Sequence, residues 1–274
     1  MMRRLIPFIA VFIAIVVAAI GGAFGDSATL PPKLIEIHRE YVRPGKLGDY
    51  DGIEADAAKS CQRLNCPASY LGITSITGPS QVWFVSWFDT YAAIEQARAA
   101  YAQNSALRDA AQSVTERKGA LVKRPETLFA EYRPGLSYGS NTSLPAAHYF
   151  WIQIVKVLPG HSRDFEAFRR SERLADERAQ AGDTVYVYHV TSGASGSVYL
   201  VLTLARSLQE ADNLAQLRIQ ERRAPEQESA SRLVAASVTS TANYLFRPEP
   251  AISYLPKSWT DADPDFWAQA AVRQ

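Results

Sequence analysis

An internal repeat constrains this chain more than any other feature of its sequence. The pattern Val-x-Pro-Gly-x-x-x-Asp-aromatic begins at Val42 and occurs again at Val157, 115 positions further along. A second pair of matches follows in the same order, because Ser137-Tyr138 and Ser253-Tyr254 each come shortly after an Arg-Pro dipeptide. Two matches at nearly the same offset predict a tandem duplication.

Each copy shows the same order of predicted elements, which is strand, helix, two strands, helix and strand. In the first copy the apolar pattern predicts strands at 34–42, 69–77, 81–88 and 128–132, and helices at 47–64 and 90–118 with a break near Asn104. In the second copy it predicts strands at 149–158, 184–191, 197–204 and 242–246, and helices at 162–180 and from Ser207 onward. This βαββαβ order is that of a ferredoxin-like unit.

Both faces of the third strand in each copy are apolar. In residues 82–88, Trp83, Val85 and Trp87 alternate with Val82, Phe84 and Phe88. A strand that is apolar on both faces is covered on both faces. One cover is the copy's own pair of helices, and the natural second cover is the sheet of the other copy. The sequence therefore predicts an α+β protein in which two ferredoxin-like sheets pack face to face within one chain.

The predicted boundaries divide the chain into a signal peptide at 1–25, a first unit at 33–138, a linker at 139–147, a second unit at 148–254 and a C-terminal tail at 255–274. Arg3 and Arg4 precede an apolar run at 5–20, and residues 23–25 fit a small-x-small cleavage site. These features predict a periplasmic or secreted protein. The alternative is an uncleaved segment that anchors the chain to the membrane.

The two cysteines, Cys61 and Cys66, are most simply a disulfide in an exported protein. A metal site would need further ligands nearby, and no other Cys or His follows at suitable spacing, so we expect no metal. The formal net charge is +1, with both signs interspersed, which excludes a basic stripe for nucleic acid. We expect no membrane contact beyond the N-terminal segment.

The strand–Pro-Gly–helix opening with its Asp49-Tyr50 and Asp164-Phe165 pairs, together with the aromatic strand at 82–88, resembles the dimeric α+β-barrel group, including the antibiotic-biosynthesis-monooxygenase-like and NIPSNAP-like families. The resemblance covers about residues 34–246. In that group two such units place their sheets face to face, so a duplicated chain is expected to form the pair as a monomer. The resemblance implies cofactor-free oxygenases, haem-degrading enzymes, dehydratase-like enzymes and proteins without activity, and thus selects no function. We expect no cofactor, with haem as the alternative.

Three polar residues on the first strand are the catalytic candidates. His38 alternates with Glu36 and Glu40, so the three share one face of the strand. A carboxylate beside a histidine can tune its proton affinity for acid–base work. The plainer alternative is that they line a wet end of the barrel or pair with Arg39 or Arg63. The second copy has Gln153 in the place of His38, so such a site would be present once.

A second group of candidates could line a cavity for a flat, apolar ligand between the two sheets: Tyr70, Trp83, Trp151, Tyr186, Tyr188 and His189. The alternative for the aromatic residues is ordinary core packing. The leading hypothesis is therefore an exported barrel that binds a small apolar or aromatic molecule. A monooxygenase-like oxidoreductase is the second hypothesis. An interaction scaffold is the third, with Trp259, Phe266 and Trp267 of the tail either docking a partner or capping the barrel.

Overall fold

The computed structural model describes residues 31–139, 142–179, 182–213, 234 and 236–268 of the chain. The predicted signal peptide at 1–25 lies outside the described residues. Within the described part, no helix combines the length and the hydrophobicity that crossing a membrane requires.

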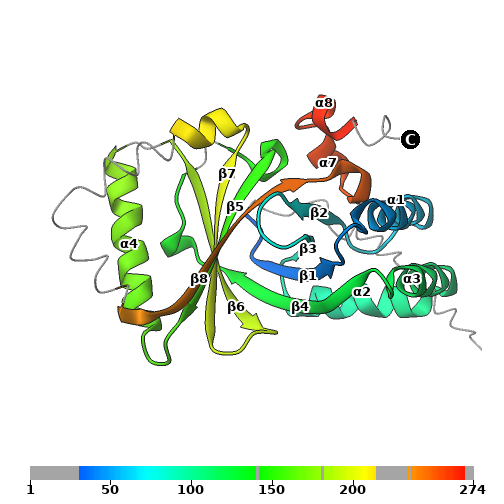
Figure 1. The fold of residues 1–274 in the computed structure, drawn as a ribbon, viewed down its shortest axis with the longest axis horizontal. Helices are drawn as coiled ribbons and strands as arrows, with labels where there is room; N and C mark the ends of the chain where they lie inside the picture. The colour runs from blue at the N-terminus through cyan, green and yellow to red at the C-terminus, as the bar shows by residue number, and fades with distance from the viewer. Residues whose placement is uncertain (1–30, 140–141, 180–181, 214–233, 235, 269–274) are drawn as a thin grey trace, which may run out of the picture.

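The described strands close into one antiparallel barrel in the order β1-β3-β2-β8-β5-β7-β6-β4. The first unit contributes β4-β1-β3-β2 and the second contributes β8-β5-β7-β6, which is the same ferredoxin-like order twice. The units join edge to edge, through β2 with β8 and through β4 with β6. Figure 1 shows α1, α2 and α3 on one side of the barrel and α4 on the opposite side. The predicted fold class is confirmed.

The elements of the first unit are β1 (Leu34–Val42), α1 (Leu47–Leu64), β2 (Tyr70–Ser75), β3 (Gln81–Phe88), α2 (Tyr91–Gln103), α3 (Ser105–Lys118) and β4 (Val122–Tyr132). Those of the second unit are β5 (Tyr149–Val157), α4 (Ser162–Ala179), β6 (Thr184–Ser192), β7 (Ser197–Ala205) and β8 (Val238–Pro248). Short helices are η1 (Pro134–Leu136), η2 (Leu144–Ala146), η3 (Pro250–Ile252), α7 (Lys257–Thr260) and α8 (Pro264–Trp267). The helix predicted from Ser207 onward is helical over residues 208–213, and residues 214–233 lie outside the described residues.

The repeated Pro-Gly dipeptide makes the turn between the first strand and the first helix of each unit. Gly45 and Gly160 both have positive φ angles, 74° and 88°. The Lys46 N–H donates to the Arg43 carbonyl at 3.1 Å, and the His161 N–H donates to the Leu158 carbonyl at 3.0 Å. Proline fixes the φ angle of its own turn position, and glycine adopts the positive φ of the next position without steric cost. The Pro-Gly dipeptide therefore specifies the turn.

The repeated Ser-Tyr dipeptide joins the two units. The Ser137 hydroxyl accepts from the Val187 N–H of β6 at 2.9 Å, and the Ser253 hydroxyl accepts from the Gly72 N–H of β2 at 3.0 Å. Tyr138 forms a bridge to Val185 and Tyr254 forms one to Tyr70. Each copy of the motif therefore pairs with a strand of the other unit, which explains why it occurs in both.

The main core lies inside the barrel and draws on both units. Its buried members include Ile37 and Trp83 from the first unit and Ile152 and Leu200 from the second. The tail folds back onto the same cluster, because Trp259 and Trp267 are 5% and 6% exposed and belong to it. The structure thus gives these two tryptophans the role of a cap on the barrel.

Candidate functional site

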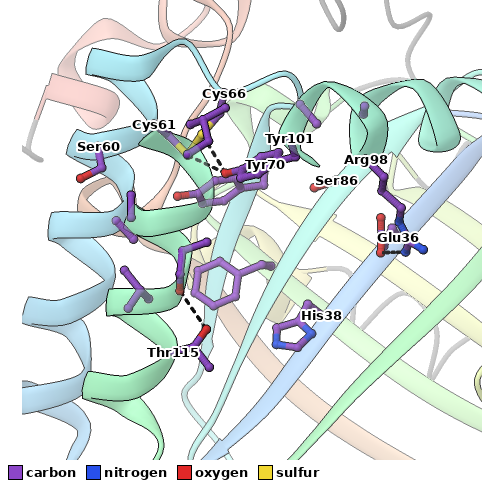
Figure 2. A pocket seen from close by; sticks show the side chains of 18 of the residues that line it. Glu36, His38, Ser60, Cys61, Cys66, Tyr70, Ser86, Arg98, Tyr101 and Thr115 are labelled. Carbon is purple, nitrogen blue, oxygen red and sulfur yellow. Dashed lines mark hydrogen bonds and ion pairs between the residues drawn. A yellow bond between two sulfur atoms is a disulfide. The ribbon is translucent and has the colours of Figure 1, made fainter. Parts of the chain in front are cut away.

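A pocket of about 490 Å³ lies between the helices of the first unit and the outer face of its sheet. In Figure 2, Glu36 and His38 extend from β1, with Glu36 toward Arg98 of α2, while Ser60 and Cys61 belong to α1. Residues of α3, among them Leu107 and Lys118, complete the lining. This volume is within the range of small-molecule sites in proteins.

Most of the pocket wall is apolar and aromatic. Tyr70 and Phe84 meet edge to face, with 5.7 Å between ring centroids. Ile94 and Leu107 come from α2 and α3 and are both buried. The Thr90 side chain accepts from the Ala93 N–H at the start of α2, and Asn104 separates α2 from α3 by capping the Leu107 N–H. This pair of caps fixes where the two helices begin.

A charged cluster lies at one end of the pocket. The Lys118 ammonium lies 2.8 Å from Oε1 of Glu40 and 2.8 Å from Oε1 of Glu54. His38 donates from Nε2 to Oε1 of Glu40 at 3.0 Å, and the Tyr50 hydroxyl donates to Oε2 of the same carboxylate. Glu40 and Glu54 are 2% and 5% exposed. Two carboxylates and one lysine in a buried place leave one unbalanced negative charge.

Burial and pairing act against each other at these groups. Burial opposes ionisation of Glu40, but hydrogen bonds from His38 and Lys118 outweigh it and lower the pKa of Glu40 to about 2. At Glu54 burial dominates over the ion pair and raises the pKa. Burial also raises the pKa of the Tyr50 hydroxyl, beside Glu54 and Glu40. Glu40 is therefore the fixed anion of the cluster, and Glu54 is the carboxylate more ready to take a proton.

The expected alternative partners of the β1 residues are wrong. Glu36 pairs with Arg98 of α2 at 2.7 Å, and Glu40 pairs with Lys118. Arg39 instead donates to Gln81 and contacts the ring of Trp83 inside the barrel, because neighbouring residues of a strand point to opposite faces. Arg63 donates to Ser60 on its own helix.

The second unit does not repeat the cluster. At the 115-residue offset, Glu40 and Tyr50 correspond to Val155 and Phe165, which pack in one apolar cluster under α4. Gln153 replaces His38 and contacts Asn243 on β8. The duplicated fold thus carries its charged pocket in the first unit.

The structure does not bring the six predicted ligand residues together. Tyr70 lines the pocket, whereas Trp83, Tyr186 and Tyr188 are buried in the barrel core. Trp151 is on the outer face of β5 and is 38% exposed. His189 contacts Ser197 and the ring of Tyr199 in the second unit. Tyr70 and Phe84 make an aromatic wall outside the barrel and beneath the helices, because both side chains line the pocket there.

Sequence reasoning missed Glu54 and Lys118, which complete the charge cluster. Glu54 shares the buried face of α1 with Tyr50 and Cys61, so a glutamate within an apolar helix face was the available signal. Lys118 ends a helix whose exposed side is rich in charge, and nothing in its local pattern marks it as buried.

The pocket does not fit haem through His38. Haem iron takes a histidine nitrogen as an axial ligand, but Nε2 of His38 contacts Glu40 and Nδ1 lies 3.1 Å from the Thr127 hydroxyl. Both ring nitrogens therefore already have a partner within the protein, and coordination of iron would break one of these contacts. Among the described residues, no group of three His, Cys, Asp or Glu side chains is placed to hold a metal ion.

The fold defines an α+β barrel made of two ferredoxin-like units. The solved structures that share it include an anthrone oxidase-like protein, with a TM-score of 0.54 and 14% identity over 80% of this chain and 92% of that chain. They also include a putative monooxygenase from Fusobacterium nucleatum, with a TM-score of 0.51 and 10% identity over 80% of this chain and 94% of that chain. Identities this low show the fold alone. No protein-family model and no curated protein sequence matches the chain.

Proposed function

We propose that this protein binds a small, flat and largely apolar molecule in the pocket between α1, α2, α3 and the first sheet. The observation that carries the proposal is the pocket itself, about 490 Å³ with an aromatic and aliphatic wall and a charged cluster at one end. Apolar walls supply affinity and a few fixed polar groups supply orientation. The ligand we expect is therefore aromatic, with a hydroxyl or carbonyl oxygen directed at His38, Glu54 and Lys118.

Filling the pocket is expected to abolish binding. Ala57 is a half-buried residue of α1 that lines the pocket, and Ala57→Phe places a ring in the space of the ligand. We expect the affinity for 2-naphthol, measured by titration calorimetry, to fall by at least about tenfold, which corresponds to about 1.4 kcal/mol.

The matched control is Ala99→Phe, an exposed position of α2 outside the pocket wall, which should bind 2-naphthol like the wild type. Equal affinities for all three proteins would contradict the proposal. Circular dichroism of each variant would show that the fold is retained.

The second candidate is an enzyme that removes a proton from its ligand and lets dioxygen oxidise the resulting anion. The cluster favours it, because one unbalanced negative charge at Glu40, Glu54 and Lys118 gives a place for one extra proton. His38 lines the pocket beside the cluster and contacts Glu40 through Nε2. In this candidate Nδ1 of His38 exchanges its contact with the Thr127 hydroxyl for the ligand and takes the proton. Support from the barrels named above is limited to their shared fold.

If this candidate is right, His38→Ala is expected to lower turnover by about 10²–10⁴-fold, the usual contribution of general acid–base catalysis. Anthrone is a suitable probe, since loss of a proton from its methylene group gives an electron-rich anion. Oxygen consumption is the measurement. His161→Ala, at an exposed histidine in the turn before α4, is the control that should keep full activity. If the wild-type protein consumes no oxygen with anthrone or with a hydroxylated naphthalene, the enzyme candidate is contradicted and the binding function remains.

A further inference from the structure

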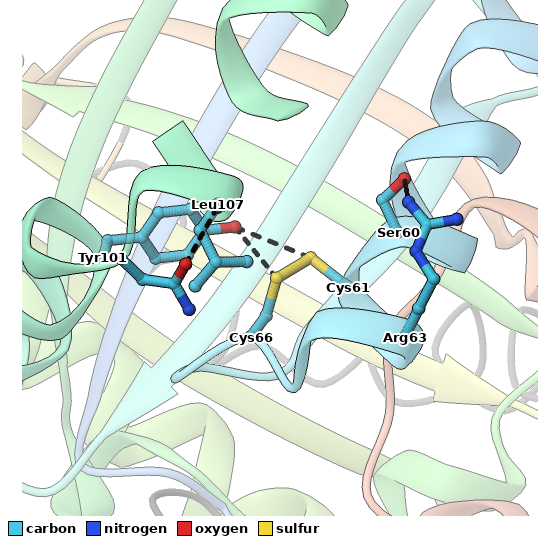
Figure 3. The surroundings of a disulfide bond; sticks show 7 residues. Ser60, Cys61, Arg63, Cys66, Tyr101 and Leu107 are labelled. Carbon is cyan, nitrogen blue, oxygen red and sulfur yellow. Dashed lines mark hydrogen bonds between the residues drawn. A yellow bond between two sulfur atoms is a disulfide. The ribbon is translucent and has the colours of Figure 1, made fainter. Parts of the chain in front are cut away.

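A disulfide forms part of the pocket wall. Figure 3 shows Cys61 in the last turn of α1 bonded to Cys66, which follows the end of the helix. Asn65 ends α1 in the left-handed conformation, with a φ of 52°, and this brings the Cys66 N–H to the Cys61 carbonyl at 3.1 Å. Both cysteines line the pocket and are otherwise buried, 7% and 8% exposed.

Tyr101 connects this disulfide to the other two helices. Its hydroxyl donates to Sγ of Cys66 at 2.9 Å and lies 3.6 Å from Sγ of Cys61. Tyr101 belongs to the last turn of α2, and Leu107 in the first turn of α3 packs in the same cluster as the cysteines. The disulfide therefore lies where the three helices that enclose the pocket meet (Figure 3).

Reduction changes this meeting point. A dithiol reductant breaks the S–S bond and becomes a disulfide itself, while Cys61 and Cys66 each gain one electron and one proton. Two thiols cannot remain at bonding distance, so at least one sulfur must move. The sulfur moves either into the pocket, which both cysteines line, or against the side chains packed around the disulfide, among them Tyr101 and Leu107. Either movement alters the space that a ligand would occupy.

We propose that the redox state of Cys61 and Cys66 controls ligand affinity in this pocket, with the disulfide form binding and the dithiol form binding weakly. This inference rests on the proposed function, because it concerns the same pocket. Linkage makes the effect reciprocal: if reduction weakens binding by a given factor, saturating ligand makes reduction less favourable by that same factor. We expect a factor of about ten, which is typical for coupled sites.

The test compares oxidised wild-type protein with protein reduced by dithiothreitol. Titration calorimetry gives the affinity of each form for 2-naphthol, and thiol quantification gives the equilibrium for reduction with and without saturating 2-naphthol. We expect about tenfold weaker binding by the reduced protein and about tenfold less favourable reduction of the protein saturated with 2-naphthol. Tyr101→Phe should make reduction easier, since the disulfide loses its hydroxyl donor, whereas Tyr91→Phe on the same helix should not, because Tyr91 contacts Thr191 instead.

The outcomes separate the two proposals. Equal affinity of the oxidised and reduced forms overturns this inference and leaves the binding function intact. No binding by the oxidised form overturns the proposed function, and this inference with it. A reduced protein that unfolds, as judged by circular dichroism, also overturns the inference, because the disulfide would then hold the fold rather than the pocket.

Discussion

Lys118→Met is expected to lower the free energy of unfolding by about 3–5 kcal/mol at pH 7, the usual effect of removing one partner from a buried ion pair. The Lys118 side chain is 15% exposed and is the cation between Glu40 and Glu54. Methionine keeps much of its length but leaves the two carboxylates facing each other in a buried place. Thermal unfolding should show a melting temperature lower by roughly 10 °C.

The deficit should shrink as the pH falls. In the wild type the pKa of Glu40 is lowered from 4.5 to about 2, so its contribution to stability is complete above pH 4.5 and is lost between pH 4.5 and about 2. In the variant the carboxylates have lost their cation, and protonation of one relieves the repulsion between them. The gap in stability between the two proteins is therefore wide at pH 7 and narrow near pH 3–4.

The matched control is Lys46→Met, which removes an exposed ion pair with Asp49. Such pairs contribute little, and the expected change is under about 1 kcal/mol. If Lys118→Met were as destabilising at pH 3.5 as at pH 7, lost packing rather than unpaired charge would be the cause of the lower stability.

Trp259→Ala is expected to lower the free energy of unfolding by about 3–5 kcal/mol, the usual cost of removing a buried tryptophan. Trp259 is 5% exposed, and its ring stacks on Trp87 with 4.6 Å between centroids and 9° between planes. It joins a core to which both units contribute. Truncation after Tyr254 removes Trp267 as well, whose Nε1 donates to the Pro145 carbonyl, and should cost more.

Trp151→Ala is the control for this substitution, because Trp151 is 38% exposed on the outer face of β5. Its loss should change the stability by much less. Denaturant unfolding of the three variants is the measurement. If truncation left the denaturant midpoint of unfolding unchanged, the tail would not be a cap. The hypothesis that the tail docks a partner protein would then be favoured.

Several elements of this protein have bounds that local sequence pattern predicts to the residue. The break at Asn104 and the bounds of β1, α1 and β3 follow from the sequence. The last strand of each unit begins earlier than expected, β4 at Val122 rather than 128 and β8 at Val238 rather than 242. Their first halves are polar and half exposed, and β4 contains Arg124 with a φ of 51°, so neither shows the alternation that marks a strand.

Local pattern also predicted one part of the candidate site and missed another. The alternation of Glu36, His38 and Glu40 on one strand was enough to place them on a common face. It did not say which face, because strands in this protein are covered on both sides. Glu54 lies 14 positions from Glu40, and Lys118 lies 78 positions from it. Their meeting depends on α1 and α3 packing over β1, which no local pattern contains.

The sequence by itself determined that the chain is duplicated, that each copy is a βαββαβ unit, and that the two sheets must cover each other. The duplication rests on two repeated motifs, and the other two conclusions rest on periodicity, which records whether each residue's own environment is apolar. The tertiary structure alone decided that β2 joins β8 and β4 joins β6, that the pocket lies under the helices, and that Lys118 pairs with two glutamates. The reason is that such contacts are properties of pairs far apart in the chain, and a residue's own pattern is the same whichever partner it meets.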